Sequence, residues 1–102
     1  MILAVVLSAL APGATASPSS KSVKIVNYAF QPGKLTIKKG TKVTWKWPAG
    51  PVVHNVTVAN GPVKFHSHDK SSGAFAHVFS RAGTYHLVCT LHPSMTETVV
   101  VT

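Results

Sequence analysis

The stretch "YHLVCTLHPSMTETVVV", from Tyr85 to Val101, decides how this chain folds. Apolar side chains alternate on both sides of a turn, with the period of two that is typical of half-buried β-strands. The turn carries the only cysteine of the chain, Cys89, followed at intervals of three residues by His92 and Met95. The stretch therefore predicts two strands joined by a turn that carries sulfur and imidazole side chains.

The same alternation recurs in most segments between the Gly/Pro turn signals. One such segment, "HNVTV", predicts a strand that begins at His54. Several short strands at this spacing predict an all-β sandwich or barrel, and we expect no helix of ordinary length. Trp45 and Trp47 are expected to lie in the core, and His77 is expected to be structural or exposed. The side chains that alternation places on one face of their strand are Val23, Ile25, Leu35, Ile37, Val43, Trp45, Trp47, Phe75, His77, Phe79, Tyr85, Leu87 and Cys89.

The N-terminal part of the chain differs in composition from the rest. Residues 1–16 begin with a short apolar run and end in Ala-Thr-Ala, a small-x-small pattern that signal peptidase accepts. We expect these residues to be a cleaved signal peptide, since the apolar run is too short to span a bilayer. Residues 17–22 are expected to be a flexible lead-in and residues 23–102 the folded domain. The protein is accordingly expected to be exported, to the periplasm, the extracellular space or the cell envelope.

The charge of the chain is strongly positive. Ten Lys and Arg residues stand against Asp69 and Glu97. This balance favours anionic partners, either an acidic redox protein or an anionic envelope surface, or it serves solubility alone. Nucleic acid is not expected, because no aromatic residues are interleaved with the basic cluster.

The single cysteine excludes an intrachain disulfide and needs another explanation. A thiolate, two imidazoles and a thioether form the ligand set of a trigonal His₂Cys copper site with a weak axial Met. Cys89, His92 and Met95 offer three of these groups. His54 is the best candidate for the fourth: if its strand runs antiparallel to the strand that ends at Cys89, the two residues meet at one end of the sandwich.

Other interpretations of these residues stay open from the pattern alone. A lone cysteine in a strand is often simply buried, and a Cys-His pair also occurs in nucleophilic catalysis. Zinc fits less well, because its structural sites prefer further Cys or His over thioether sulfur. His66 and His68 either lie in a solvated loop or form a second metal site.

Several stretches resemble the cupredoxins, specifically the small plastocyanin/amicyanin group. The likeness covers nearly all of the chain after residue 16, and the short spacing between His92 and Met95 is similar to amicyanin. One departure is Glu97, where relatives commonly have Gly. The stretches that carry the resemblance are "YAFQPGKLTIKKGTKVTWKW" (28–47), "HNV" (54–56), "FHS" (65–67), "AGTYHLVC" (82–89) and "CTLHPSM" (89–95).

The resemblance implies a Greek-key β-sandwich of about seven to eight strands and one type 1 (blue) copper ion. It also implies a monomeric carrier of single electrons between a donor and an acceptor protein, not an enzyme. The alternative is a protein that holds or delivers copper without a dedicated role in electron transfer. The implied ligands are His54, Cys89, His92 and Met95; Asn55 would brace the ligand loop, and Leu91, Pro93, Pro48, Pro51 and Val52 would form a docking patch.

Overall fold

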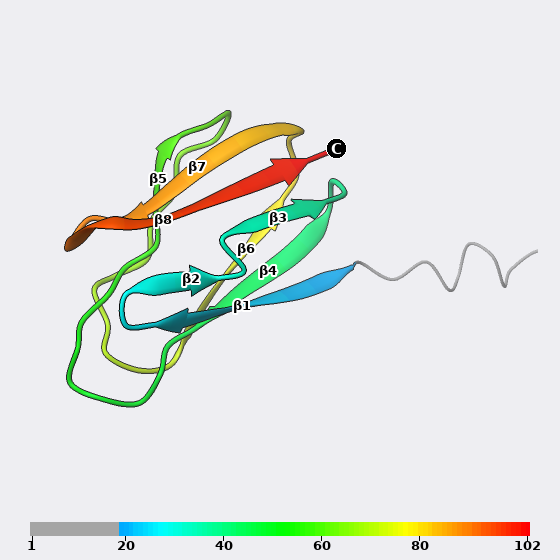
Figure 1. The fold of residues 1–102 in the computed structure, drawn as a ribbon. Coiled ribbons are helices and arrows are strands. Elements are labelled where there is room, and N and C mark those ends of the chain that lie inside the picture. Colours follow the sequence, from blue (N-terminus) through cyan, green and yellow to red (C-terminus); the bar gives the residue numbers. More distant parts are fainter. Residues whose placement is uncertain (1–18) are drawn as a thin grey trace, which may run out of the picture.

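The computed structural model describes residues 19–102, which form two four-stranded β-sheets packed face to face (Figure 1). One sheet has the strand order β2-β1-β4-β6 and the other the order β3-β8-β7-β5. This confirms the predicted all-β sandwich. Within residues 19–102 there is no helix long and apolar enough to cross a membrane. The strands are β1 (Ser20–Val26), β2 (Ala29–Gln31), β3 (Lys34–Ile37), β4 (Thr41–Lys46), β5 (Thr57–Asn60), β6 (Ala74–Phe79), β7 (Gly83–Cys89) and β8 (His92–Val101).

Alternation along the strands fills the space between the two sheets, as the sequence predicts. In β4 and just after it, Val43, Trp45 and Trp47 are buried, while Thr44 between them is partly exposed and Lys46 is exposed. In β6 the ring of His77 is partly buried and stacks on Phe65, with 3.7 Å between the ring centroids. The core therefore contains aromatic side chains from both layers, which supports a rigid frame.

The beginning of β1 corrects one expectation. The predicted signal peptide, residues 1–16, lies outside the described residues. The predicted lead-in, residues 17–22, reaches into them, and there Ser20 to Ser22 belong to β1 and pair in parallel with Lys42 to Thr44 of β4. Their side chains are exposed, so composition suggested a flexible segment; the backbone pairing that orders them has no signature in their side chains.

Three connections meet at one end of the sandwich, at the left of Figure 1: the β7–β8 turn, the β1–β2 turn and the segment between β4 and β5. β5 and β7 run antiparallel, as expected, with Thr57 opposite Val88. The strand predicted to begin at His54 begins at Thr57, because His54 pairs instead in an isolated bridge with Lys70. This end of the molecule gathers the residues that the sequence singles out.

Candidate metal centre

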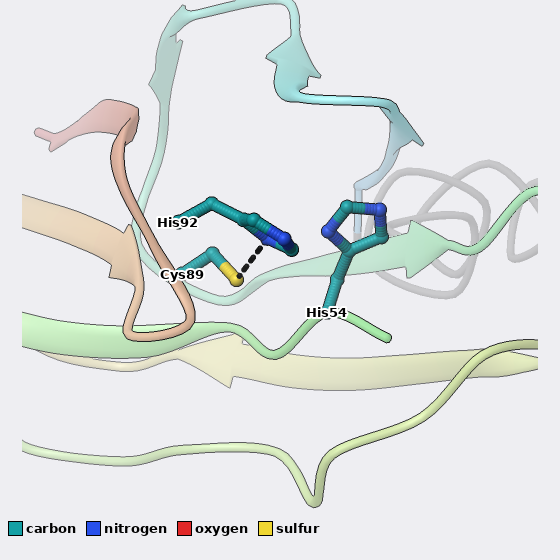
Figure 2. A group of neighbouring side chains, drawn as sticks. All are labelled: His54, Cys89 and His92. Carbon is teal, nitrogen blue, oxygen red and sulfur yellow. Dashed lines mark hydrogen bonds between the residues drawn. The ribbon is translucent and has the colours of Figure 1, made fainter. Parts of the chain in front are cut away.

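His54, Cys89 and His92 lie together at this end, where their side chains point toward one shared point (Figure 2). One donor atom of each residue lies within 4.8 Å of the donor atoms of the other two. In the part of the chain that the structure describes, this is the one group of three or more His, Cys, Asp or Glu side chains placed closely enough to hold a metal ion. Both strands of the β7–β8 pair and the segment before β5 contribute to it.

The tight turn between β7 and β8 brings Cys89 and His92 together. Cys89 is the last residue of β7 and pairs with His92, the first residue of β8, so that only Thr90 and Leu91 lie between the strands. The Sγ of Cys89 and the Nδ1 of His92 are 3.5 Å apart. The turn is thus shorter than the sequence suggests, and His92 and Met95 both belong to β8.

His54 is fully buried and its main chain is held firmly. It exchanges two backbone hydrogen bonds with Lys70, and its carbonyl oxygen accepts a hydrogen bond from the indole N–H of Trp47 at 3.2 Å. Burial, and after it the neighbouring His92, lowers the pKa of His54 below its ordinary value. A lowered pKa favours the neutral imidazole, which is the form that binds a metal.

The two nitrogens of the His54 ring have different surroundings. Nε2 lies 2.9 Å from the amide oxygen of Asn27, in the β1–β2 turn. Nδ1 is buried and has no hydrogen-bond partner in the described part of the chain. An unpaired buried nitrogen is costly unless something occupies its lone pair, and in Figure 2 this nitrogen faces the sulfur of Cys89 and the imidazole of His92. The site therefore fits a metal ion that prefers sulfur and nitrogen ligands.

Asn55 ties the segment before β5 to the β7–β8 turn. Its backbone N–H donates to the Sγ of Cys89 at 3.4 Å. Its side-chain amide donates to Thr90 Oγ1 at 2.7 Å, and the backbone N–H of Thr90 donates back to Asn55 Oδ1 at 3.1 Å. The amide also donates to the carboxylate of Asp69 at 2.9 Å. These contacts are of the kind that fixes ligand orientation.

Met95, the expected axial ligand, is fully buried and lies on β8 three residues after His92. The thioether belongs to the same buried cluster as Cys89. His92, in contrast, is partly exposed, and beside it in the chain Leu91 is 45% exposed and Pro93 is exposed. In the segment after β4, Pro51 is exposed and Pro48 and Val52 are partly exposed. All the apolar residues expected to form a docking patch thus reach the surface.

Sequence reasoning missed the contribution of the β1–β2 turn. Asn27 bonds to His54, and the exposed ring of Tyr28 lies edge-on to His92 with 4.8 Å between the ring centroids. Nothing in the sequence around these residues marks them, because the contacts join positions far apart in the chain. His66 and His68, in contrast, are exposed and stand outside the His54–Cys89–His92 group.

Glu97 lies in the core on β8, two residues after Met95. It is 2% exposed, and its Oε1 accepts a hydrogen bond from the indole N–H of Trp45 at 2.8 Å. The other carboxyl oxygen, Oε2, has no hydrogen-bond partner among the described residues. Burial raises the pKa of Glu97 to about 7, although the hydrogen bond from Trp45 acts in the opposite direction. The residue that departs from the family pattern is therefore an acid inside an apolar core.

Known proteins match this chain in sequence and in structure. The model of copper-binding proteins of the plastocyanin/azurin family matches residues 18–102. Amicyanin-alpha of Methylorubrum extorquens is 35% identical over 103 residues, 92% of this chain and 86% of the relative.

Solved structures of copper proteins also match this chain. The Cu(I) form of an amicyanin variant has a TM-score of 0.72 at 30% identity, over 87% of this chain and 88% of that one. A copper-containing nitrite reductase from Thermus scotoductus has a TM-score of 0.76 at 23% identity, which is a likeness of fold. The match covers 85% of this chain but spans only 23% of the length of the reductase.

Proposed function

Since the chain belongs to the plastocyanin/azurin family of copper-binding proteins, we propose that it is an electron carrier whose copper ligands are His54, Cys89, His92 and Met95. The observation that carries the proposal is that the buried Nδ1 of His54, which has no partner among residues 19–102, faces Cys89 and His92 in the group that these residues form (Figure 2). Bound copper would supply one-electron chemistry by alternating between Cu(I) and Cu(II).

The chain contributes a fixed set of donors in a rigid frame. Cys89 supplies a thiolate, which favours Cu(I), and the two imidazoles suit both oxidation states. Met95 supplies a weak thioether donor from within the core. Because Asn55 and the tight β7–β8 turn hold the donors in place, little rearrangement accompanies a change of charge. This is the property that fast electron transfer requires.

The partly exposed His92 is the proposed point at which electrons enter and leave. Its apolar surroundings, Leu91 and Pro93 with Pro48, Pro51 and Val52, would form the docking patch. A small apolar patch suits a weak, short-lived complex with another redox protein. The chain's two acidic side chains are Glu97, buried in the core, and Asp69, bonded to Asn55, and neither placement suggests an acid-base pair. Their placement supports a carrier and not an enzyme.

The partners are proposed to be acidic donor and acceptor proteins that meet a monomeric carrier outside the cytoplasm, in the periplasm, the extracellular space or at the cell envelope. Along β1 and β4, Lys24 lies opposite Lys46, and Lys42 is also exposed. Such a surface speeds association with an anionic partner, and salt weakens the effect. An electron-transfer rate with an acidic acceptor that is independent of ionic strength would argue against this partner.

A second candidate function is the holding or delivery of copper. Against it, His54, Cys89 and Met95 are all fully buried, whereas a metal that is passed between proteins needs accessible ligands. The two functions differ in how long copper is retained: a carrier exchanges electrons with a partner many times without losing copper.

The proposal is tested by the visible spectrum of the purified protein after addition of Cu(II) and then ascorbate. We expect an intense band near about 600 nm from thiolate-bound Cu(II), which bleaches on reduction and returns on oxidation. Copper content measured before and after several such cycles should stay the same. A protein that retains no copper, or retains it without colour, would contradict the proposed function.

Replacing the thioether gives a further expectation. In Met95→Leu, copper should stay bound while the reduction potential rises, because a weak donor to the oxidised ion is lost and leucine fills a similar volume. The potential is measured by redox titration of the visible band. A lowered potential would contradict the assignment of Met95 as a ligand.

A further inference from the structure

A hydrogen bond joins Asn27, in the β1–β2 turn, to His54, in the segment before β5. Asn27 follows β1, in the sheet β2-β1-β4-β6, whereas Cys89 and His92 belong to the opposite sheet. The β1–β2 pairing, with Val26 opposite Ala29, fixes the short turn that carries Asn27 and Tyr28. The turn also contacts the site through Tyr28, whose ring lies against both His92 and His54. The site is thus bounded on this side by a turn that supplies no ligand.

The acceptor in this hydrogen bond decides which nitrogen of His54 carries the hydrogen and which has a lone pair available for a metal. A neutral imidazole carries one hydrogen, on either Nδ1 or Nε2. The amide oxygen of Asn27 can only accept, so at 2.9 Å from Nε2 it favours the tautomer with the hydrogen on Nε2. The lone pair then lies on Nδ1, the buried nitrogen that has no partner among residues 19–102 and that faces Cys89 and His92 in Figure 2.

We infer that Asn27 is a positioning residue that selects the metal-binding tautomer of His54 and tunes its strength as a copper donor; this inference rests on the proposed copper site. An acceptor on the far nitrogen of a ligating histidine orients the ring and makes it more basic. Asn27 itself is exposed, so its contact with the fully buried imidazole of His54 links the candidate metal centre to the surface of the protein.

Two substitutions at this position are expected to act in opposite directions. Asn27→Leu has a similar shape but no acceptor, so His54 becomes a weaker donor. Cu(II) affinity should fall roughly 10- to 100-fold, Cu(I) affinity should fall less, and the reduction potential should rise. Asn27→Asp keeps the acceptor and adds a negative charge, which strengthens the hydrogen bond and favours Cu(II), so its potential should fall below that of the parent protein.

The experiment compares the potentials of copper-loaded parent, Asn27→Leu and Asn27→Asp at neutral pH. Asn60→Leu, an equivalent change at an exposed position of β5, serves as the matched control and should leave the potential unchanged. A merely structural role for Asn27 would shift both variants in the same direction. With colour intact, equal potentials or shifts of the same sign would overturn the inference and leave the proposed function standing.

A second measurement does not depend on copper. Nitrogen NMR of the full-length parent without added metal, recorded above the pKa of His54, should show hydrogen on Nε2 and none on Nδ1. Asn27→Leu should show a mixture of the two tautomers. A parent protein with hydrogen on Nδ1 would overturn the inference even if the protein is blue. A colourless parent with the expected tautomer would contradict the proposed function, and with it the tuning of copper, but not the selection of the tautomer by Asn27.

Discussion

Replacing Cys89 by alanine is expected to abolish the intense visible band of the copper-loaded protein. The band requires a thiolate bound to Cu(II), and Cys89 is the only cysteine of the chain. Copper affinity should fall more than about 100-fold, since even groups that only support the ligands change metal affinity by 10- to 100-fold. The measurements are the visible spectrum after addition of Cu(II) and a competition titration with a copper chelator.

The control for this change is His66→Ala. His66 is exposed, and its ring contacts the backbone oxygen of Ser67 at 3.0 Å instead of the metal centre. Its loss should leave colour and affinity intact. Because Cys89 is fully buried, circular dichroism should verify that Cys89→Ala keeps the sandwich. A folded Cys89→Ala protein that remains blue would refute the ligand assignment.

The second large effect concerns the buried acid. Burial raises the folded-state pKa of Glu97 to about 7, against about 4.5 in an exposed carboxyl group. The folded state therefore binds this proton more tightly than the unfolded state. This tighter binding of the proton by Glu97 stabilises the folded state fully below about pH 4.5. The stabilisation decreases between about pH 4.5 and 7 and is lost above pH 7. The total loss amounts to about 3 kcal/mol of unfolding free energy.

Glu97→Gln tests this directly. Its amide oxygen still accepts from Trp45, but the side chain cannot ionise. The variant should be more stable than the parent by about 3 kcal/mol at pH 8 and close to it at pH 4.5. Denaturant unfolding of both proteins across this pH range, with and without copper, gives the difference, in which the titration of the histidines cancels. Parallel stability profiles for parent and variant would contradict the account.

Glu97→Leu separates the charge from the hydrogen bond. It also removes the ionisable group, but it leaves the indole N–H of Trp45 buried without an acceptor. Such an orphaned donor costs about 1–3 kcal/mol. We therefore expect Glu97→Leu to lose the pH dependence as Glu97→Gln does while being less stable than Glu97→Gln at every pH.

The strands could be predicted from the sequence because, in each layer of the sandwich, buried and exposed residues alternate along a strand. Val43, Trp45 and Trp47 alternate with two exposed lysines and a partly exposed threonine, and Tyr85, Leu87 and Cys89 alternate with exposed or partly exposed residues. The same logic could have placed Glu97: on β8 it follows Met95 and precedes Val99 at intervals of two, on the face that is buried. Its charge obscured a pattern that its neighbours made plain.

The other features had no local trace. Ser20 to Ser22 are held in a strand by backbone pairing with β4, and nothing in their exposed polar side chains indicates this pairing. His54 is predicted to begin a strand, but it lies outside β5 and pairs with Lys70 from a later loop. The contact of Asn27 with the same histidine spans 27 positions. Long-range contacts of these kinds depend on the assembled fold, and no window of the sequence contains them.

The order of strands in the sheet β3-β8-β7-β5 has a consequence for the time at which the centre comes into being. β8 pairs with both β3 and β7, yet it is the last of these strands in the chain. During synthesis, β3 must wait for β8 before it can join this sheet, and the same strand brings His92 and Met95. Contacts between distant segments form slowly. The same strand therefore closes the sheet and completes the proposed ligand set, so a nascent chain that still lacks β8 has no finished site in which to trap copper.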